Sequence, residues 1–195
     1  MTTLPAPLVL ASGSTYRASM LARLGLDFAI DPADIDERPV PGESPRELAL
    51  RLALEKARVV AERHPEACVI GADQVAGLDD GRILGKPGSV DRAIEQIREM
   101  RGRRVTWHSG IALLGPGLER SDVVDTCIDI RRLGDEEIRR YVEIDRPLDC
   151  AGAMRSESLG IALVDRMASD DPTALIGMPL IRIAAWLRTA GFAVP

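Results

Sequence analysis

The sequence predicts a mixed α/β fold in which helices cover the faces of one elongated sheet. In the first half of the chain, short apolar segments typical of buried strands alternate with segments of helical periodicity. In the middle, residues 105–114 and 123–130 resemble two long strands that a Gly-Pro-Gly turn joins into a hairpin. No internal repeat, low-complexity tract or proline-rich linker interrupts the chain, so we expect one domain over residues 1–195.

Turn residues bound the first elements. Residues 8–11 form a short apolar run before a Ser/Gly turn, which predicts a buried strand. A helix should follow over residues 16–24 and end at Gly25, because glycine readily adopts the conformation that closes a helix. Residues 31–43 are rich in Pro, Asp and Glu and are expected to form a loop.

The second helix has the clearest start signal. Ser44, Pro45 and Glu47 supply an N-cap hydroxyl, a proline at the first helical position and a glutamate at the third. This is a capping box, in which two side chains satisfy backbone N–H groups that the helix itself leaves unpaired. The apolar face behind it predicts a helix to about Arg63.

Residues 68–72 are predicted to form a second buried strand, with Asp73 at its carboxyl end. Open α/β sheets place ligand chemistry at that end of their strands. The remaining expected elements are a turn at 79–81 followed by a short strand, a tight turn at 85–88, a helix around Ile94, Ile97 and Met100, a helix over 135–144, a strand over 160–164 and a helix over 179–189 closed by Gly191.

Composition excludes several classes of function. The formal net charge of −5 argues against binding to nucleic acid through its backbone, although a few converging Lys and Arg side chains could hold a phosphorylated small molecule. Three scattered cysteines fit a reducing cytoplasm better than a disulfide framework or a zinc site. The first residues do not resemble a signal peptide, and no stretch approaches the roughly 18 apolar residues that cross a bilayer, so no membrane partner is expected.

Polar residues between the first strand and helix suggest an anion site. In the segment 12–17, small residues let the backbone approach an anion, Ser12 offers a hydroxyl, and Arg17 could form paired hydrogen bonds with phosphate oxygens. The simpler reading is a Ser/Gly turn that only caps the helix, since the Gly-Lys-Ser/Thr of a P-loop is missing.

Other charged residues stand where a core would not require them. Asp73 could bind a divalent cation or accept a proton from water, or it could simply cap a turn. Lys86 lies in a tight turn between Gly85 and Pro87, whereas Lys56 lies within the capped helix, where a solvated lysine is the ordinary expectation. Acidic residues in loops are usually solvated, which is the simpler reading of Glu37 and of Glu157. The two histidines are too far apart for a metal site: His64 is expected at the surface and His108 on a strand.

Taken together, these segments resemble the Maf family of nucleotide pyrophosphatases over nearly the whole chain. The segments that carry the resemblance are Leu10-Ala11-Ser12-Gly13-Ser14 with Arg17, Asp36-Glu37, Leu52-Ala53-Leu54-Glu55-Lys56-Ala57, Gly71-Ala72-Asp73-Gln74-Val75, Gly85-Lys86-Pro87, Pro147-Leu148-Asp149-Cys150-Ala151-Gly152 and Gly177-Met178-Pro179-Leu180. Each is a weak signal alone, whereas seven in the right order are a strong one.

The resemblance implies an inosine-triphosphatase-like fold with a cleft between two lobes, and hydrolysis of a nucleoside triphosphate to its monophosphate and pyrophosphate with Mg²⁺ or Mn²⁺. It makes Asp73 the catalytic proton acceptor and a metal ligand, with Glu37 on the metal side. The residues that it assigns to the triphosphate are Ser12, Arg17, Lys56 and Lys86. A homodimer is common among such proteins.

Three positions separate base preferences within the family, and here they hold Tyr16, Gln74 and Glu157. These residues resemble the branch that acts on 7-methyl-GTP and removes it as a modified nucleotide. N7-methylation makes guanine cationic, and an aromatic face attracts a cation by roughly 0.5–2 kcal/mol. A glutamate can accept hydrogen bonds from the N1–H and the amine of guanine, a pair of donors that uracil and thymine lack. That branch typically has Trp preceded by Pro where this chain has Tyr16 and Thr15.

Two alternatives differ from this reading. The same reaction could act on other triphosphates such as dTTP or UTP, or the chain could be a non-catalytic nucleotide-binding regulator of septum formation. In the second case Asp73, Lys86 and Glu37 would be dispensable.

Overall fold

The computed structural model describes residues 6–195, so most of the segment on which the absence of a signal peptide was predicted lies outside the described residues. Within this range seven strands form one mixed sheet. The strands are β1 (Leu8–Leu10), β2 (Ala29–Ile30), β3 (Cys68–Leu78), β4 (Ile83–Leu84), β5 (Arg104–Gly115), β6 (Leu118–Ile130) and β7 (Val164–Ser169). The helices are α1 (Thr15–Ala22), α2 (Pro45–Arg63), α3 (Val90–Met100), α4 (Asp135–Asp145) and α5 (Leu180–Thr189), with 3₁₀ helices η1 (Ala151–Ala153), η2 (Leu159–Leu163) and η3 (Ala174–Ile176).

The sheet has a short parallel part and a long antiparallel part, which confirms the predicted mixed α/β class. The strand order is β2-β1-β3-β5-β6-β7, and β4 pairs with β3 beside this path. β1 runs parallel to both β2 and β3, whereas β3, β5, β6 and β7 pair in antiparallel fashion. β5 and β6 form the predicted hairpin around the Gly-Pro-Gly turn, but β6 begins at Leu118 rather than at the predicted Val123, because residues 118–122 also pair with β5.

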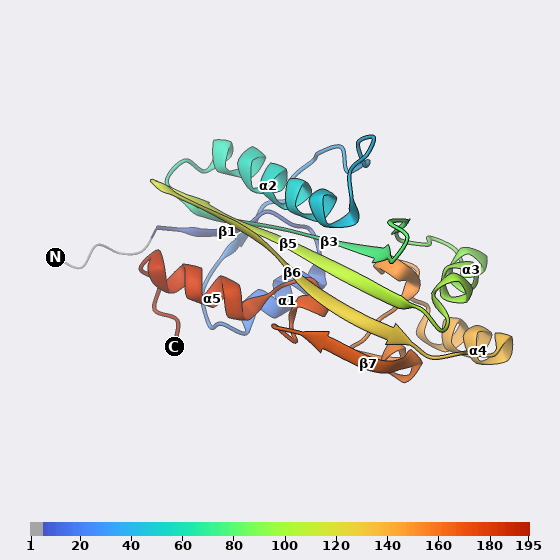
Figure 1. Cartoon of the computed structure of the whole chain (residues 1–195). Helices are drawn as coiled ribbons and strands as arrows, with labels where there is room; N and C mark the ends of the chain where they lie inside the picture. The colour runs from blue at the N-terminus through green and yellow to red at the C-terminus, as the bar shows by residue number, and fades with distance from the viewer. Residues whose placement is uncertain (1–5) are drawn as a thin grey trace.

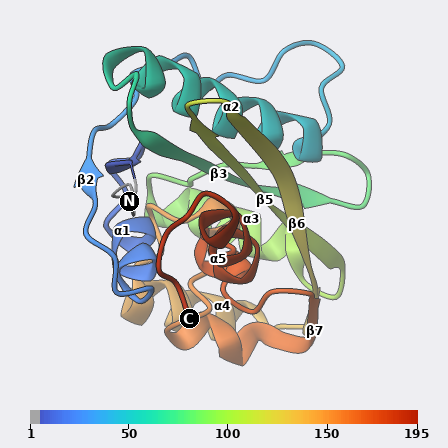
Figure 2. The same cartoon turned by 90° about the vertical axis from the view of Figure 1, so that its left-hand side faces the viewer.

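Helices cover both faces of the sheet. α2 lies along one face of the long strands, α1 and α5 lie on the other, and α3 and α4 lie toward one end (Figure 1). The view along the sheet shows α2 separated from the other helices by β3, β5 and β6 (Figure 2). Among the described residues, no helix combines the length and apolar character that crossing a membrane requires.

α2 packs unusually close to the sheet because glycine faces it. A Cβ atom added at Gly71 of β3 would overlap the backbone oxygen of Ala53, and one at Gly110 of β5 would overlap that of Ala49. The N-terminus of α2 is the predicted capping box: Glu47 N donates to Ser44 Oγ at 3.3 Å, and Ser44 N donates to Glu47 Oε2 at 2.9 Å. The helix ends at Arg63, as the sequence indicates.

Two further strand predictions need correction. The strand predicted to end before Asp73 continues to Leu78, because residues 69–78 pair with β5 along their whole length. Residues predicted as a strand over 160–164 form η2 instead, since Ser158 N and Gly160 N both donate to Arg155 O and curl the chain. The strand begins only at Val164.

Candidate active site

A cleft of about 620 Å³ brings together eight of the nine residues that the sequence singled out. Its walls come from the β1–α1 loop, the segment that precedes α2, the inner face of α2, the middle of β3, and the turn after β4. The predicted residues that line it are Ser12, Tyr16, Arg17, Glu37, Lys56, Asp73, Gln74 and Lys86. Glu157 does not line the cleft wall.

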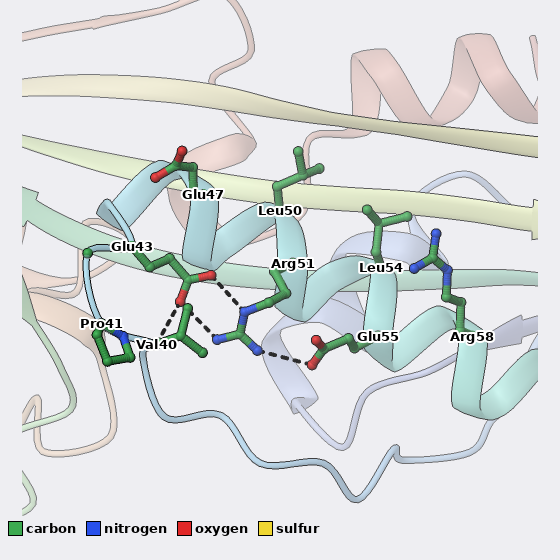
Figure 3. A pocket seen from close by; sticks show the side chains of 10 residues that line it. Val40, Pro41, Glu43, Glu47, Leu50, Arg51, Leu54, Glu55 and Arg58 are labelled. Carbon is green, nitrogen blue, oxygen red and sulfur yellow. Dashed lines mark hydrogen bonds and ion pairs between the residues drawn. The ribbon is translucent and has the colours of Figure 1, made fainter.

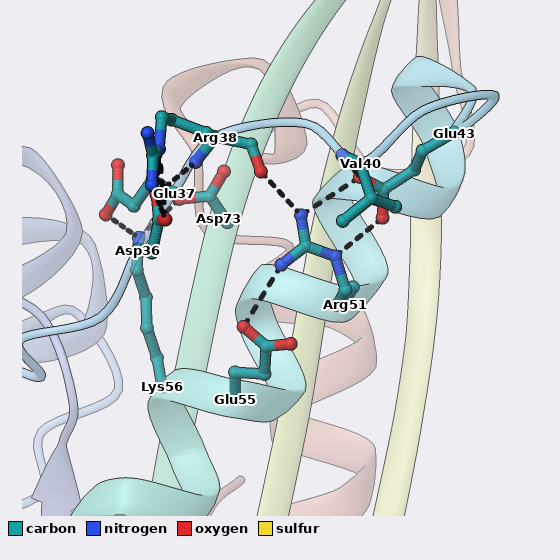
Figure 4. A network of polar contacts seen from close by, with 9 residues as sticks. All are labelled: Asp36, Glu37, Arg38, Val40, Glu43, Arg51, Glu55, Lys56 and Asp73. Carbon is teal, nitrogen blue, oxygen red and sulfur yellow. Dashed lines mark hydrogen bonds and ion pairs between the residues drawn. The ribbon is translucent and has the colours of Figure 1, made fainter.

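A buried lysine between two carboxylates forms the centre of the cleft. Lys56 Nζ lies 2.6 Å from Asp73 Oδ1 and 2.6 Å from Glu37 Oε1 (Figure 4). Lys56 and Asp73 are 6% and 7% exposed, so water screens their attraction only weakly. The expectation that Lys56 is an ordinary solvated helix residue is therefore wrong.

Asp73 reaches the cleft from the middle of β3 rather than from its end. β1 pairs with β3 only as far as Leu10 opposite Ile70, and beyond that point the chain leaves the sheet as the loop that carries Ser12. Asp73 thus lies just past the carboxyl end of the parallel part of the sheet, which is where the general rule for open α/β sheets places a ligand.

The β1–α1 loop combines helix capping with groups that turn toward Asp73. Ser14 Oγ accepts from Arg17 N at 3.4 Å and caps α1, so the simpler reading of this loop holds for Ser14. Ser12 Oγ instead accepts from Arg17 Nη1 at 3.3 Å, and Arg17 Nη2 lies 3.8 Å from Asp73 Oδ1. Arg17 Nε also donates to Gly177 O at 3.3 Å, which fixes the orientation of the guanidinium.

Positive charge from three side chains meets at Glu37. Burial alone would raise the pKa of the Glu37 carboxyl, but the hydrogen bond from Lys56 and the charges of Lys56, Lys86 and Arg17 outweigh it, and the pKa lies below its usual value. Lys86 stands in a turn that Gly85 anchors, since Gly85 O accepts from Gly152 N at 3.3 Å and from Gln96 Nε2 at 3.1 Å. Three cations thus lie around two carboxylates within one cleft, an arrangement suited to a polyphosphate that arrives with a metal ion.

One end of the cleft holds an aromatic ring with a cation over it. The Arg155 guanidinium lies 5.8 Å from the ring centroid of Tyr16 and donates to Asp149 Oδ1 at 3.2 Å. Burial raises the pKa of the Tyr16 hydroxyl, the Arg155 charge lowers it, and the charges of Asp149 and Glu157 add to the rise. Glu157 therefore lies close enough to Tyr16 to act on it electrostatically, although it is outside the cleft wall.

Gln74 lines the cleft, but its amide nitrogen is engaged elsewhere. Gln74 Nε2 lies 2.9 Å from both Ala174 O and Leu175 O and 3.0 Å from Ser109 Oγ. The amide nitrogen thus ties β3 to η3, and the amide oxygen is the atom that Gln74 can offer to a ligand.

Comparison with known proteins identifies the family. A model of the family described as Maf-like protein matches residues 7–190. The chain belongs to the Maf-like family.

Relatives within the Maf-like family are similar over nearly their whole length. A protein of Aromatoleum aromaticum named 7-methyl-GTP pyrophosphatase is 51% identical over 190 residues, which cover 96% of this chain and 97% of that protein. A protein of the same name from Cupriavidus pinatubonensis is 50% identical over 195 residues, with 98% of each chain covered. A third, from Xanthomonas campestris, is 49% identical over 189 residues, covering 96% of this chain and 98% of that protein.

Solved structures support the predicted fold. A HAM1 protein from Coxiella burnetii superimposes with a TM-score of 0.56 at 16% identity, covering 94% of this chain and 99% of that one. The Ham1 protein of Staphylococcus aureus superimposes with a TM-score of 0.52 at 16% identity and covers 94% and 98% of the two chains. At this identity the likeness concerns the fold alone, and it confirms the inosine-triphosphatase-like class.

The donor chemistry of this Maf-like cleft fits a magnesium-type ion that a substrate helps to hold. Two carboxylates, Glu37 and Asp73, each bond the same Lys56 nitrogen, so their oxygens lie near one another. Residues 6–195 contain no cluster of three or more His, Cys, Asp and Glu side chains that could form a complete cage. Mg²⁺ is usually held by one or two carboxylates together with substrate phosphates and water, which is what this pair can offer.

Sequence reasoning missed two residues at the aromatic end. Asp149 belongs to one of the segments that carry the family resemblance, so that segment was the available signal. Arg155 had no such signal, because nothing in its sequence neighbourhood places it over a ring 139 positions earlier.

Proposed function

We propose that this Maf-like protein hydrolyses 7-methyl-GTP to 7-methyl-GMP and pyrophosphate. The observation that carries the proposal is the buried Lys56, which bonds Asp73 and Glu37 at 2.6 Å each beside the loop of Ser12 and Arg17. The names of relatives about 50% identical over nearly the full length point to the same reaction and the same nucleotide.

In this proposal the residues around the triphosphate have separate roles, which their contacts support. Arg17, Lys56 and Lys86 neutralise the triphosphate, and the Ser12 hydroxyl adds a hydrogen bond. A divalent cation held by Glu37, Asp73 and the phosphates would neutralise charge that develops on the departing pyrophosphate.

Asp73 is the proton acceptor in this scheme. Within residues 6–195 the hydrogen bond and the ion pairs that reach Asp73 end on Oδ1, which leaves Oδ2 to take a proton from water. The water oxygen forms a bond to the α phosphorus, the α–β phosphoanhydride bond breaks, and pyrophosphate leaves with the electron pair. Lys56 keeps the carboxylate oriented through Oδ1.

The charge around Tyr16 favours a cationic base. One guanidinium, that of Arg155, faces the ring, while the carboxylates of Asp149 and Glu157 raise the pKa of the Tyr16 hydroxyl. Asp145 and Asp149 also pair with Arg155, at 4.0 Å and 3.2 Å, and so offset its charge. This excess of negative charge attracts the positive ring of 7-methylguanine more than neutral guanine or a pyrimidine. The base stacks on Tyr16 on the face away from Arg155, or it replaces the guanidinium there.

A substrate panel tests the reaction and its specificity. Purified protein with Mg²⁺ or Mn²⁺ is given 7-methyl-GTP, GTP, dTTP and UTP, and released pyrophosphate is measured. We expect the highest kcat/KM on 7-methyl-GTP and at least a 100-fold lower kcat for Asp73→Asn, with nucleotide binding retained. Asp129→Asn on β6 outside the cleft is the matched control and should keep full activity. No pyrophosphate from any nucleotide would refute the proposal.

Base recognition has its own test. Glu157→Gln should lower the ratio of kcat/KM for 7-methyl-GTP over GTP while pyrophosphate release continues, because it removes one negative charge near Tyr16. Glu62→Gln, at the end of α2, changes the net charge equally and should leave the ratio unchanged. Equal ratios in Glu157→Gln and in the unmodified protein would rule out a role of Glu157 in selecting the base.

A further inference from the structure

Arg51 holds the segment that carries Glu37, and it does so outside the cleft. Its Nε donates to Glu43 Oε1 at 2.7 Å, and its Nη2 donates to Glu43 Oε2 at 2.9 Å and to Arg38 O at 3.0 Å. Nη1 completes the set with a bond to Glu55 Oε2 at 3.1 Å (Figure 4). Four of the five N–H groups of this guanidinium are thus used, three of them on residues 38–43.

Packing contributes little to the position of this segment. A hollow of about 540 Å³ lies between residues 40–43 and the outer face of α2, lined by Val40, Leu50 and Leu54 together with the Arg51 and Glu43 pair (Figure 3). Val40 is 51% exposed, so its side chain anchors the segment weakly. Ile35, two residues before Glu37, packs against buried Leu48 and Leu52, but apolar contact is sparse on the far side of Glu37, where the Arg51 contacts hold the segment.

On the cleft side the segment is held by the ion pair between Glu37 and Lys56, and the substrate phosphates would compete for the same lysine. Glu37 is held through Lys56, yet Lys56 also serves Asp73 and, in the proposed reaction, the phosphates. Its carboxylate is more than half exposed, so water weakens that ion pair. In the proposed reaction the metal would replace Lys56 as the partner of Glu37, and the segment would then depend on its outer anchor.

We propose that Arg51 and Glu43 form a clasp that positions Glu37 for the divalent cation. The inference rests on the proposed function, because it assigns Glu37 to the metal of that reaction. Neither clasp residue lines the catalytic cleft, so Arg51 is a positioning residue.

The geometry separates the clasp from an ordinary surface ion pair. The Glu43 side chain is only 6% exposed, and the two carboxylate oxygens each take a separate Arg51 donor in paired fashion. Glu43 Oε2 also accepts from Val40 N at 3.1 Å, which ties the carboxylate to its own loop. The Arg51 bonds lower the pKa of the Glu43 carboxyl, so the clasp stays charged at neutral pH.

Metal binding gives the decisive measurement. The probe is the Mn²⁺ complex of a GTP analogue with a methylene group in place of the α–β bridging oxygen, and its Kd is measured by calorimetry on the full chain. Arg51→Met should weaken this complex about 10-fold, the effect typical of losing an outer partner of a metal ligand. The Mg²⁺ concentration for half-maximal activity should rise similarly, while kcat at saturating Mg²⁺ stays within about 2-fold. Arg51→Lys keeps the charge but not the paired geometry, so its Kd should lie between those of the unmodified protein and Arg51→Met.

Arg58→Met is the matched control. Arg58 lies two turns further along α2, lines the same hollow and pairs with Glu119 at 3.1 Å, away from the Glu37 segment. It should change neither the Kd nor the Mg²⁺ requirement. The exchanged pair Arg51→Glu with Glu43→Arg should recover part of the affinity that either single change loses, because it restores opposite charges at the two positions.

A second readout keeps the clasp distinguishable from the proposed function. Hydrogen exchange should accelerate at residues 36–40 in Arg51→Met but not in Arg58→Met, with unchanged exchange in the core of β3. If the unmodified protein released no pyrophosphate, the proposed function would fail, and exchange would still report on the clasp. Equal Kd values for Arg51→Met and Arg58→Met, or equal exchange at 36–40, would overturn the inference.

Discussion

Replacing Lys56 by methionine isolates the contribution of the buried ion pair to stability. The change keeps an unbranched side chain of similar length and removes the ammonium, which leaves the Asp73 carboxylate almost fully buried. Removing one partner of a buried pair typically costs 3–5 kcal/mol, because a charge is left without compensation. Arg17 at 3.8 Å compensates Asp73 in part, so we expect the lower end, about 3 kcal/mol in the free energy of unfolding.

A double-mutant cycle tests where this cost comes from. Lys56→Met leaves the Asp73 charge without its partner, and Asp73→Asn removes that charge. The double variant should therefore be more stable than the sum of the single effects implies, by about 1.5–3 kcal/mol. Glu37→Gln should cost less than about 1 kcal/mol, because its carboxylate is largely solvated. Urea unfolding at pH 7.5, followed by circular dichroism, gives each value.

The outcome can contradict the reasoning clearly. Additive effects of Lys56→Met and Asp73→Asn, within about 0.5 kcal/mol, would mean that no energetic coupling joins them. Asp129→Asn combined with Lys56→Met is the control pair, since Asp129 bonds Arg104 on the neighbouring strand and should be additive with Lys56.

Two further predictions concern backbone packing and thiol ionisation. Gly110→Ala should lose about 3 kcal/mol of stability or more, because the new Cβ would overlap the Ala49 carbonyl and backbone cannot move aside as a side chain can. Thermal unfolding measures this loss. Gly85→Ala is the control and should keep the stability of the unmodified protein, because a Cβ at that position meets no other atom. Burial and the neighbouring Asp149 carboxylate raise the pKa of the Cys150 thiol to about 11. Only about 0.1% is then thiolate at pH 8, so iodoacetamide should label it slowly, with a rate that rises about tenfold per pH unit to pH 10; a plateau below pH 9 would contradict the burial argument.

Local signals explain most of the fold that could be predicted. The capping box at Ser44 and Glu47 needs only four consecutive residues, and the structure contains it. The β5–β6 hairpin follows from two apolar segments and the turn between them. In such cases the residues that interact are close in the sequence, so the local pattern is enough to predict the element.

The errors occurred where backbone hydrogen bonds, which the residue pattern does not show, decide the element. β3 continues past Asp73 because β5 supplies hydrogen bonds across the sheet, although a carboxylate after an apolar run resembles a strand end. The residue pattern of 160–164 does not distinguish a strand from a turn. Backbone hydrogen bonds to Arg155 O favour the helical turn η2. The strand β2 consists of two residues and is defined only by its pairing with β1.

The same distinction holds within the site. Eight of the predicted residues line the cleft. They could be predicted because the family resemblance relates segments from across the chain, whereas composition and periodicity describe only local sequence. Arg155 was missed because only the folded chain places its guanidinium over Tyr16. Roles for all these residues are still predictions, and the variants above test them.

The charges in the cleft suggest why metal and nucleotide should bind together. Three cations, Arg17, Lys56 and Lys86, meet three carboxylates, Asp73, Glu37 and Asp149, so the charges that line the cleft balance before any ligand arrives. A divalent cation alone would have to compete with the Lys56 ammonium for the carboxylates of Asp73 and Glu37, whereas a bare triphosphate would meet these two carboxylates at the point where its phosphates must lie. Their complex would avoid both conflicts, because its remaining negative charge would be attracted by the cations while its metal would replace Lys56 as the partner of Glu37. Lys56 would keep its bond to Asp73 and lose the one to Glu37, and this exchange is why a second anchor for Glu37 matters.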